Sequence, residues 1–245
     1  MGRIFLIFIL MFSLSFSQDV DDDMLDEFDD DIKVEQKQSD DPFESYNIFM
    51  TNFNDNIYHS VWKPTATAYK NGVNKDIRKS IENVFLNLGY PINFINNILQ
   101  FKIKNAAIET ERFIINSTLG MFGLFDIAKT TFGLEPKKED FGQTLGYWGV
   151  GSGPHIVLPF FGPSNLRDVV SFYPDGLVNP VIYNENRNYN VATSGYMTVG
   201  LTMYERLNTT SLNIEIYDSL TNSALSKYQV LKTSYEQKRK REIHE

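Results

Sequence analysis

A glycine- and proline-rich stretch from Phe141 to Asp168, FGQTLGYWGVGSGPHIVLPFFGPSNLRD, constrains this chain more than any other segment. Its six glycines and three prolines prevent one long helix or one regular strand from running through it unbroken. Aromatic and aliphatic residues lie between them, which a loop exposed to solvent would not carry. We therefore expect irregular backbone packed tightly against apolar surroundings, with close approach at the glycines and internal partners for the amide groups.

The negative charge of the chain is concentrated in one segment. The formal net charge is −8, but residues 19–41 hold twelve Asp and Glu side chains and only two lysines. The rest of the chain is close to neutral, and it lacks the basic face that nucleic-acid binding requires. Hydrophobic residues make up 42% of the chain, which is ample for a core. We predict no nucleic-acid partner.

Two N-terminal segments are expected to precede the folded domain. Residues 1–17 are typical of a secretory signal peptide, with Arg3 followed by a short apolar run. An uncleaved anchor is the alternative, although the run is shorter than the roughly 20 residues that a membrane span needs. Residues 18–41 are expected to form a disordered acidic linker, because they are poor in the apolar side chains of a core. Calcium binding is the alternative there, but the glycine of an EF-hand loop is absent.

The chain has no cysteine and only three histidines. The lack of cysteine excludes disulfides, thiolate metal sites, thiol catalysis and lipid attachment through an N-terminal cysteine. The histidines, His59, His155 and His244, lie on unlike segments far apart in sequence, whereas a metal site needs clustered ligands. We predict neither a metal nor a cofactor.

Amphipathic helices are expected on both sides of the central stretch, because apolar residues recur at three- and four-residue steps. The expected ranges are 41–57, 58–69 broken by Pro64, 74–88, 91–99, 105–128, 196–207 and 225–235. Asp41 and Asn74 are suitable N-caps, Gly89 is expected to end one helix, and Pro91 is expected to start the next.

The remaining segments are less regular. Ser164 is the expected cap of a short helix that carries Arg167 and Asp168, and residues 172–195 are predicted to form a loop. The basic end Lys238–Arg241 could touch anionic headgroups or the acidic linker, but we expect it to be solvated.

The run from Phe113 to Phe125 contains no charged residue. As a helix it would be about 20 Å long, which is short of a bilayer core of about 30 Å. Two interpretations remain open from the pattern, a helix in the protein core and a helix lying within one leaflet.

The motif Gly149-Val150-Gly151-Ser152-Gly153 does not support an enzyme. A nucleophile elbow needs glycines two residues before and after the serine, where this chain has Val150 and Pro154. A phosphate-binding loop needs a following helix and, in the Walker form, a lysine.

The simplest role for Arg167 and Asp168 is a local ion pair. The alternative is that the Arg167 guanidinium attracts a lipid phosphate.

The central stretch resembles the signature of the MlaA/VacJ family. Further resemblance lies in DPFESYNIFMTNFNDNIY at 41–58, RFIINSTLGMFGLFDIA at 112–128 and SKYQVLKTSYEQKR at 226–239. The resemblance implies an all-α single domain at 42–239, followed by a basic tail at 240–245. Its amphipathic helices would form a ring around a central channel, with the glycine- and proline-rich segment as a loop.

The same resemblance implies a function without covalent chemistry. The protein would be exported to the periplasmic leaflet of the outer membrane and maintain lipid asymmetry by passing phospholipids to a periplasmic lipid-binding carrier protein, with a trimeric porin as partner. Family members are typically lipoproteins, so the lack of cysteine is a departure and predicts a non-lipidated protein. The alternatives are a porin-associated scaffold and a phospholipid hydrolase, for which we see no suitable residues. The lipid channel would involve Asn52, Phe53, Gly149, Gly151, Gly153, Pro154, Leu158, Pro159 and Arg167.

Overall fold

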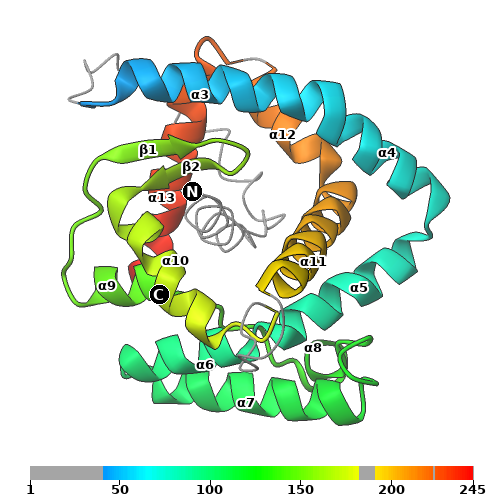
Figure 1. The fold of residues 1–245 in the computed structure, drawn as a ribbon. Coiled ribbons are helices and arrows are strands. Elements are labelled where there is room, and N and C mark those ends of the chain that lie inside the picture. The colour runs from blue at the N-terminus through cyan, green and yellow to red at the C-terminus, as the bar shows by residue number, and fades with distance from the viewer. Residues whose placement is uncertain (1–40, 182–190, 223, 245) are drawn as a thin grey trace.

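A computed structural model describes residues 41–181, 191–222 and 224–244. The predicted signal peptide and almost all of the predicted acidic linker lie outside these ranges. Within them the chain is mostly helical, which confirms the all-α class, and Figure 1 shows the helices following one another around a ring. The helical elements are α3 (Glu44–Ile57), η1 (Tyr58–Trp62), α4 (Lys63–Gly72), α5 (Lys75–Leu88), α6 (Tyr90–Leu99), α7 (Ile103–Thr118), α8 (Ile127–Phe132), α9 (Phe141–Tyr147), α10 (Leu166–Val178), α11 (Val191–Leu212), α12 (Ile214–Thr221) and α13 (Lys227–His244).

The first side of the ring is one continuous helical rod made of α3, η1 and α4 (Figure 1). The rod begins at Glu44, and the prediction of Asp41 as its N-cap is wrong, because Phe43 holds that position. Asp41 instead accepts a hydrogen bond from the Phe43 amide through its Oδ1. The predicted break at Pro64 is wrong. Pro64 lies in the first turn of α4, directly after the π-helical segment η1, and the backbone stays helical at Lys63. A wider π turn before proline accommodates its ring and missing amide without ending the helix.

The predicted boundaries of α5 and α6 are confirmed. The Asn74 side chain accepts a hydrogen bond of 2.8 Å from the Asp76 amide and caps α5, which ends at Gly89. Pro91 lies in the first turn of α6, where its missing amide has no helical partner to lose. Helix α6 packs against α7, and the pair forms the lower edge of the ring in Figure 1.

The single helix predicted over 105–128 is wrong. Helix α7 ends at Thr118, the chain turns back through residues 119–125, and α8 begins at Ile127. Two glycines allow this turn. A Cβ on Gly120 would lie 2.2 Å from the Phe125 carbonyl oxygen, and Gly123 has a φ of 92°. The uncharged run is therefore neither a core helix nor a 13-residue helix in one leaflet.

The central stretch contains a short helix and a hairpin. The Asp140 side chain accepts the Gln143 amide, the Gln143 side chain accepts the Asp140 amide, and this capping box starts α9. Strands β1 (His155–Leu158) and β2 (Gly162–Asn165) pair antiparallel, with Leu158 opposite Gly162. The prediction that no long helix or strand crosses the stretch is confirmed, but the hairpin was not predicted.

The predicted loop at 172–195 is wrong at both ends, because α10 continues to Val178 through Pro174 and α11 begins at Val191. The cap is Asn165, whose Oδ1 accepts the Asp168 amide, and not the predicted Ser164. Helix α10 packs against α9, and buried Asp175 on it accepts hydrogen bonds from the Phe141 amide and from Asn96. These tertiary bonds stabilise a helix that contains proline. Residues 182–190 lie outside the described ranges.

The last helices close the ring. The predicted helices at 196–207 and 225–235 are present within the longer α11 and α13, and α12 lies between them. The predicted solvated end at Lys238–Arg241 is wrong for Arg239, which is only 4% exposed, whereas Lys240 and Arg241 are exposed as predicted. All four residues continue α13. Helix α13 packs against α9, α3 and β2, which joins the two ends of the described chain.

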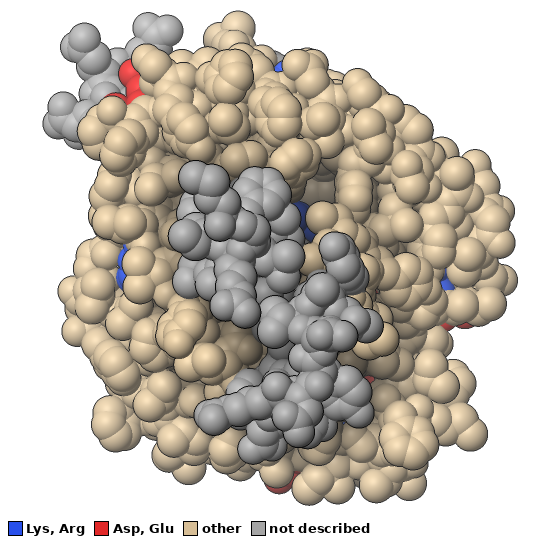
Figure 2. Space-filling view, in the orientation of Figure 1, with Lys and Arg blue, Asp and Glu red and all other residues tan. Residues whose placement is uncertain are grey.

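The burial pattern is the reverse of that in a water-soluble protein. The largest fully buried side chains are all polar: Gln100, Asn47, Asn96, Asn97, Asn208, Thr144 and Ser211. Large apolar side chains are exposed instead, and in Figure 2 Lys, Arg, Asp and Glu appear only in small isolated spots on the visible face. On α5, for example, Ile77 is exposed while Arg78 is buried. Among the described helices, none has both the length and the apolar character that crossing a membrane requires.

Candidate functional site: the hairpin and the glycine segment beside the ring

Two asparagines of α3 hold the hairpin. The fully buried Asn47 donates to the His155 carbonyl oxygen at 3.0 Å and accepts from the Val157 amide at 2.8 Å. One heptad later, Asn54 donates to the Leu158 carbonyl oxygen at 2.9 Å and accepts from the Phe160 amide at 2.6 Å. Asn47 replaces the missing neighbouring strand for one residue pair of β1, and Asn54 does the same where β1 leads into the turn. The hairpin is therefore fixed to the helical rod by side chains and not by a larger sheet.

The turn of the hairpin contacts elements on two sides of the ring. The Phe160 ring meets the Phe53 ring of α3 edge-to-face, with centroids 5.3 Å apart. The Arg206 guanidinium of α11 lies 4.7 Å from the centroid of the buried Phe161 ring, a cation–π contact. Burial lowers the pKa of Arg206 to about 10, opposed by Glu205, so the guanidinium is charged at neutral pH. Phe160 holds a left-handed φ of 66°, which a side chain seldom adopts without such restraints.

The glycine segment that precedes the hairpin is open and not tightly packed. Gly149, Gly151 and Gly153 are all exposed, and a Cβ on Gly149 or Gly151 would meet no atom within 4 Å. The expected close approach is therefore wrong at these two positions. Gly149 and Gly153 do have left-handed φ values of 87° and 67°, so glycine is needed there for conformation.

Close approach does occur at two other glycines of the same stretch, on α9. A Cβ on Gly142 would lie 2.5 Å from Asp168 Oδ1 and 2.6 Å from Arg239 Nη2. A Cβ on Gly146 would lie 2.6 Å from the Ile243 side chain. Because these two glycines have no side chain, α13 and its Arg239 can approach the backbone of α9. Such close approach was predicted from the sequence for the glycines of this stretch in general.

Arg239 is the centre of a buried ion network behind the glycine segment. Its guanidinium makes a bidentate contact with Asp140, at 2.7 and 2.8 Å, and its Nε lies 3.0 Å from Asp168 Oδ2. Tyr235 also donates to Asp168. Although burial favours the neutral acid, these partners hold the pKa of Asp168 below its usual value. The network joins α9, α10 and α13.

The ion pair predicted between Arg167 and Asp168 is confirmed, with 2.9 Å between Arg167 Nε and Asp168 Oδ1. Both residues are buried, and Arg167 also donates to the Val150 carbonyl oxygen. The Arg167 amide donates to the Ser152 carbonyl oxygen. Arg167 thus holds the glycine segment against the start of α10, while its role toward a lipid phosphate stays a prediction.

A second buried carboxylate lies beside this network. Asp175 accepts the Phe141 amide at the start of α9 and the Asn96 side chain of α6. Burial, with the nearby Asp140 carboxylate, raises the pKa of Asp175 to about 7. This carboxyl group therefore changes charge near neutral pH, at the junction of α6, α9 and α10.

The other predicted site residues lie in three places. Leu158 and Pro159 are half-buried at the hairpin turn, close to Phe53 through the neighbouring Phe160 contact. Pro154 is half-buried at the end of the glycine segment, and its carbonyl oxygen accepts the Leu166 amide. Asn52 is exposed on α3.

The histidines are not gathered. His155 is buried between the rings of Tyr228 and Tyr235, and His59 lies 3.4 Å from Asp55. In the part of the chain that the structure describes, no three His, Asp or Glu side chains are grouped so as to hold a metal ion.

Sequence reasoning missed the residues that position the site. Asn47 and Asn54 were not among the predicted site residues, although their seven-residue spacing in the helix predicted at 41–57 is a usable signal. Arg239 was assigned to a basic end, and no local signal pairs it with Asp140, 99 residues away in the sequence.

Known proteins match this architecture. The model of the MlaA lipoprotein family matches residues 39–242. A Rickettsia typhi protein of uncharacterized function is 31% identical over 188 residues, which cover 74% of each chain. The intermembrane phospholipid transport system lipoprotein MlaA of Escherichia coli is 35% identical over 146 residues, 58% of each chain. A solved structure described as the structural basis for maintenance of bacterial outer membrane lipid asymmetry matches with a TM-score of 0.70 and 28% identity, covering 84% of this chain and 100% of that chain.

Proposed function

Because this chain belongs to the MlaA lipoprotein family, we propose that it passes phospholipids from the outer membrane to a soluble lipid-binding carrier in the periplasm. The relatives named for intermembrane phospholipid transport and the solved structure described for lipid asymmetry support the general role. The transfer route and the partners are our proposal for this chain.

The reversed burial pattern is the observation that carries the proposal. The hydrocarbon of a bilayer cannot hydrogen-bond to protein, so a protein at that depth must pair its polar groups internally and present apolar side chains outward. This chain buries Asn, Gln, Thr and Ser side chains between its helices and exposes large apolar residues. Short amphipathic helices arranged in a ring suit a position within one leaflet. A ring in the periplasmic leaflet would open toward the periplasm, where a carrier can dock.

The hairpin and the glycine segment are the parts that we assign to the lipid path. Irregular backbone is tolerated at membrane depth where it lines a cavity or is buried in protein. Gly149, Gly151 and Gly153 supply a segment with little side-chain bulk, and Pro154, Leu158 and Pro159 continue it into the hairpin. Phe53 supports the hairpin turn, and Asn52 is exposed one residue before it on the same helix. We assign Arg167 to holding this segment in place.

The proposed mechanism needs no covalent step. The phospholipid headgroup would move past the glycine segment while the acyl chains stay against apolar side chains, and the carrier would then take up the lipid. A trimeric porin would hold the ring at a fixed depth, as the resemblance to the family implies.

The test is transfer of intact lipid. Full-length protein is incorporated into vesicles that contain fluorescent phospholipid, a periplasmic lipid-binding carrier is added, and the lipid recovered with the carrier is measured and checked for hydrolysis. We expect intact lipid on the carrier, and less of it with Asn54→Ala, which loosens the hairpin. Porin binding without transfer would favour the scaffold, and recovery of lysolipid would favour a hydrolase.

A further inference from the structure

Positive charge is concentrated on the last helix, α13. This helix carries six Lys and Arg side chains and two Glu side chains. The rest of residues 42–245 carries 14 Lys and Arg side chains against 17 Asp and Glu side chains. An anionic partner is therefore attracted to α13, while the remainder of residues 42–245 tends to repel it.

Two cations near the end of α13, Lys240 and Arg241, have exposed side chains. Of the exposed side chains of α13 only Glu236 is acidic, and it lies 3.4 Å from His155 Nδ1. The other ion pairs that α13 forms with described residues are Lys227–Asp55, Lys232–Asp41, Lys238–Glu242, Arg239–Asp140, Arg239–Asp168 and Arg239–Glu242. Among the residues that the structure describes, Lys240 takes part in none of these pairs. The surface around Lys240 can thus accept additional acidic side chains.

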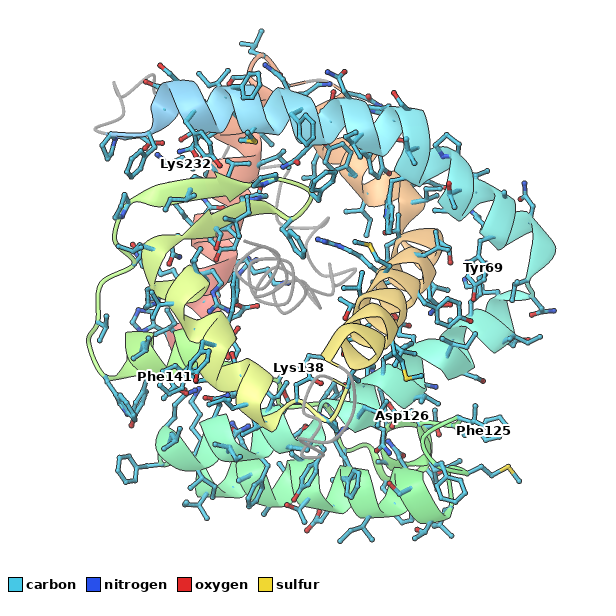
Figure 3. All side chains as sticks on the ribbon, in the orientation of Figure 1. Tyr69, Phe125, Asp126, Lys138, Phe141 and Lys232 are labelled. Carbon is cyan, nitrogen blue, oxygen red and sulfur yellow. The ribbon has the colours of Figure 1, made fainter. Side chains whose placement is uncertain are left out.

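A strongly acidic part of the chain joins the fold at the same helix. Residues 19–40, which we call the acidic segment, hold eleven Asp and Glu side chains and two lysines. They lead directly into Asp41, whose side chain is only 1% exposed. The Asp41 carboxylate accepts a hydrogen bond from the Tyr228 hydroxyl of α13, and its Oδ2 lies 3.5 Å from Lys232 Nζ. Figure 3 shows Lys232 on the side of the ring where α3 begins.

Further contacts hold Asp41 in this position. The Asn47 side chain donates to Asp41 Oδ2 at 3.0 Å, and the Phe43 amide donates to Asp41 Oδ1 at 2.9 Å. Lys232 Nζ also lies 5.8 Å from the centroid of the Tyr228 ring, a cation–π contact. The acidic segment therefore begins from a fixed point on α13.

The exposed cations lie within reach of that point. Lys232 and Lys240 are eight residues apart on one helix, which is about 12 Å along its axis. The 22 residues of the acidic segment could span at most about 75 Å. Attachment at Asp41 also holds the segment near α13 at an effective concentration on the order of millimolar. A free anion or a lipid headgroup lacks this advantage.

From these observations we propose that the acidic segment docks on the basic surface of α13 around Lys240 and Arg241. The occupant of this surface is residues 19–40 of the same chain. Docking neutralises the surface and adds ionic contacts to the helix that joins the two ends of the described chain. The inference goes beyond the proposed function and holds whether or not the protein transfers lipid.

The first test is carbodiimide cross-linking of the full-length protein, which joins carboxylates to lysines that they contact. An equal amount of isotope-labelled protein is added, so that links within one chain are distinguished by mass from links between two copies. We expect links within one chain from the acidic segment to Lys240, and few to Lys104, which is exposed on α7.

Salt gives the same measurement an internal control. At about 1 M NaCl the Debye length falls to about 3 Å, so the links from the acidic segment to Lys240 should be lost. The link between Lys63 and Asp218, whose charged atoms lie 2.5 Å apart within the fold, should persist and shows that the cross-linking chemistry still works.

The second test measures energy transfer between two fluorophores in the full-length protein. The chain has no native cysteine, so thiols introduced by Phe28→Cys and Gln237→Cys are the only labelling sites. Residue 28 lies in the acidic segment, and residue 237 is exposed on α13. We expect efficient transfer at low salt and a loss of transfer when Lys240→Glu and Arg241→Glu are combined.

Two controls separate docking from changes in folding or in net charge. Lys75→Glu combined with Lys79→Glu makes the same change of charge at two exposed positions of α5 and should leave the transfer unchanged. Replacing the three aspartates at 29–31 with asparagine alters only the acidic segment, outside the described fold, and should reduce the transfer as the α13 variant does.

Four outcomes would overturn the proposal. They are equal effects of the α5 and α13 charge reversals, links to Lys104 as abundant as those to Lys240, links only between two copies, and protection of Lys240 by phosphatidylglycerol vesicles but not by the acidic segment. The last result would assign the basic surface to lipid headgroups. Docking without lipid transfer would overturn only the proposed function.

Discussion

Replacing Asn54 with alanine tests whether α3 holds the hairpin. The change removes two hydrogen bonds, from the Asn54 amide group to the Leu158 carbonyl oxygen at 2.9 Å and from the Phe160 amide to Asn54 Oδ1 at 2.6 Å. At about 1 kcal/mol for each bond, the free energy of unfolding should fall by about 2 kcal/mol. The left-handed φ of Phe160 itself costs about 1–2 kcal/mol, so the freed turn should also relax.

The measurements are urea unfolding in detergent, followed by circular dichroism, and hydrogen exchange of the amides at 158–162. A loss of about 2 kcal/mol corresponds to roughly 30-fold faster exchange wherever local opening limits it. Asn52→Ala is the matched control, because Asn52 is exposed two residues away and should change stability by less than about 0.5 kcal/mol. Equal stability of the Asn54 and Asn52 variants, with unchanged exchange in the hairpin, would refute the reasoning.

Four further substitutions test the rest of the site by urea unfolding. Gly151→Ala should change the free energy of unfolding by less than about 0.5 kcal/mol, because a Cβ there meets open space. Gly153→Ala should lower it by about 1–2 kcal/mol, because φ is 67°; equal effects of the two changes would contradict the assignment. Arg239→Met should cost about 3–5 kcal/mol, since two aspartates lose their cation, and a loss below about 1 kcal/mol would show that the network is dispensable. The pKa of Asp175 is raised in the folded protein, so the unfolded chain loses the Asp175 proton at a lower pH than the folded chain does. The free energy of unfolding of the wild type therefore falls as the pH rises from about 4 to about 7. Relative to the wild type, Asp175→Asn should therefore gain stability as the pH rises from about 4 to about 7, and a constant difference would refute the pKa assignment.

Local signals in the sequence were sufficient where a helix boundary depends on neighbouring residues. Asn74, Gly89 and Pro91 were placed correctly, because a cap, a stop and a first-turn proline act within one turn of the helix. Pro64 and Pro174 were read as breaks by the same rules and are accommodated within helical segments. A π-helical turn precedes the first, and the packing of α10 against α9 supports the second. Neither the π-helical turn nor the packing can be recognised from a local sequence pattern.

Periodicity identified the two faces of each helix but not which face would be exposed. Ile77 belongs to the apolar face of α5, yet the structure exposes Ile77 and buries Arg78. The choice depends on the surrounding medium, because polar side chains between helices are favourable only when the outside is apolar. The family resemblance, and not the periodicity, supplied that information.

The candidate site was predicted in outline only. The glycine-rich stretch was correctly chosen as irregular, yet the tight contacts are at Gly142 and Gly146 and not at Gly149 or Gly151. The sequence alone does not tell whether a glycine is needed for its backbone conformation or because a side chain would collide with neighbouring atoms. The pairing of Arg239 with Asp140 and Asp168 was missed, because these residues come from three helices that only the complete ring brings together.

The central claim is that this ring conducts phospholipid to a carrier, and one experiment tests it most directly. Labelled phospholipid is placed in vesicles with the full-length protein, and the label that reaches a purified periplasmic lipid-binding carrier is followed over time with wild type, Asn52→Ala and Asn54→Ala. Our account predicts transfer of intact lipid by the wild type, slower transfer by both variants, and lower stability for Asn54→Ala alone. Label that reaches the carrier at the same rate with and without the protein would contradict the account.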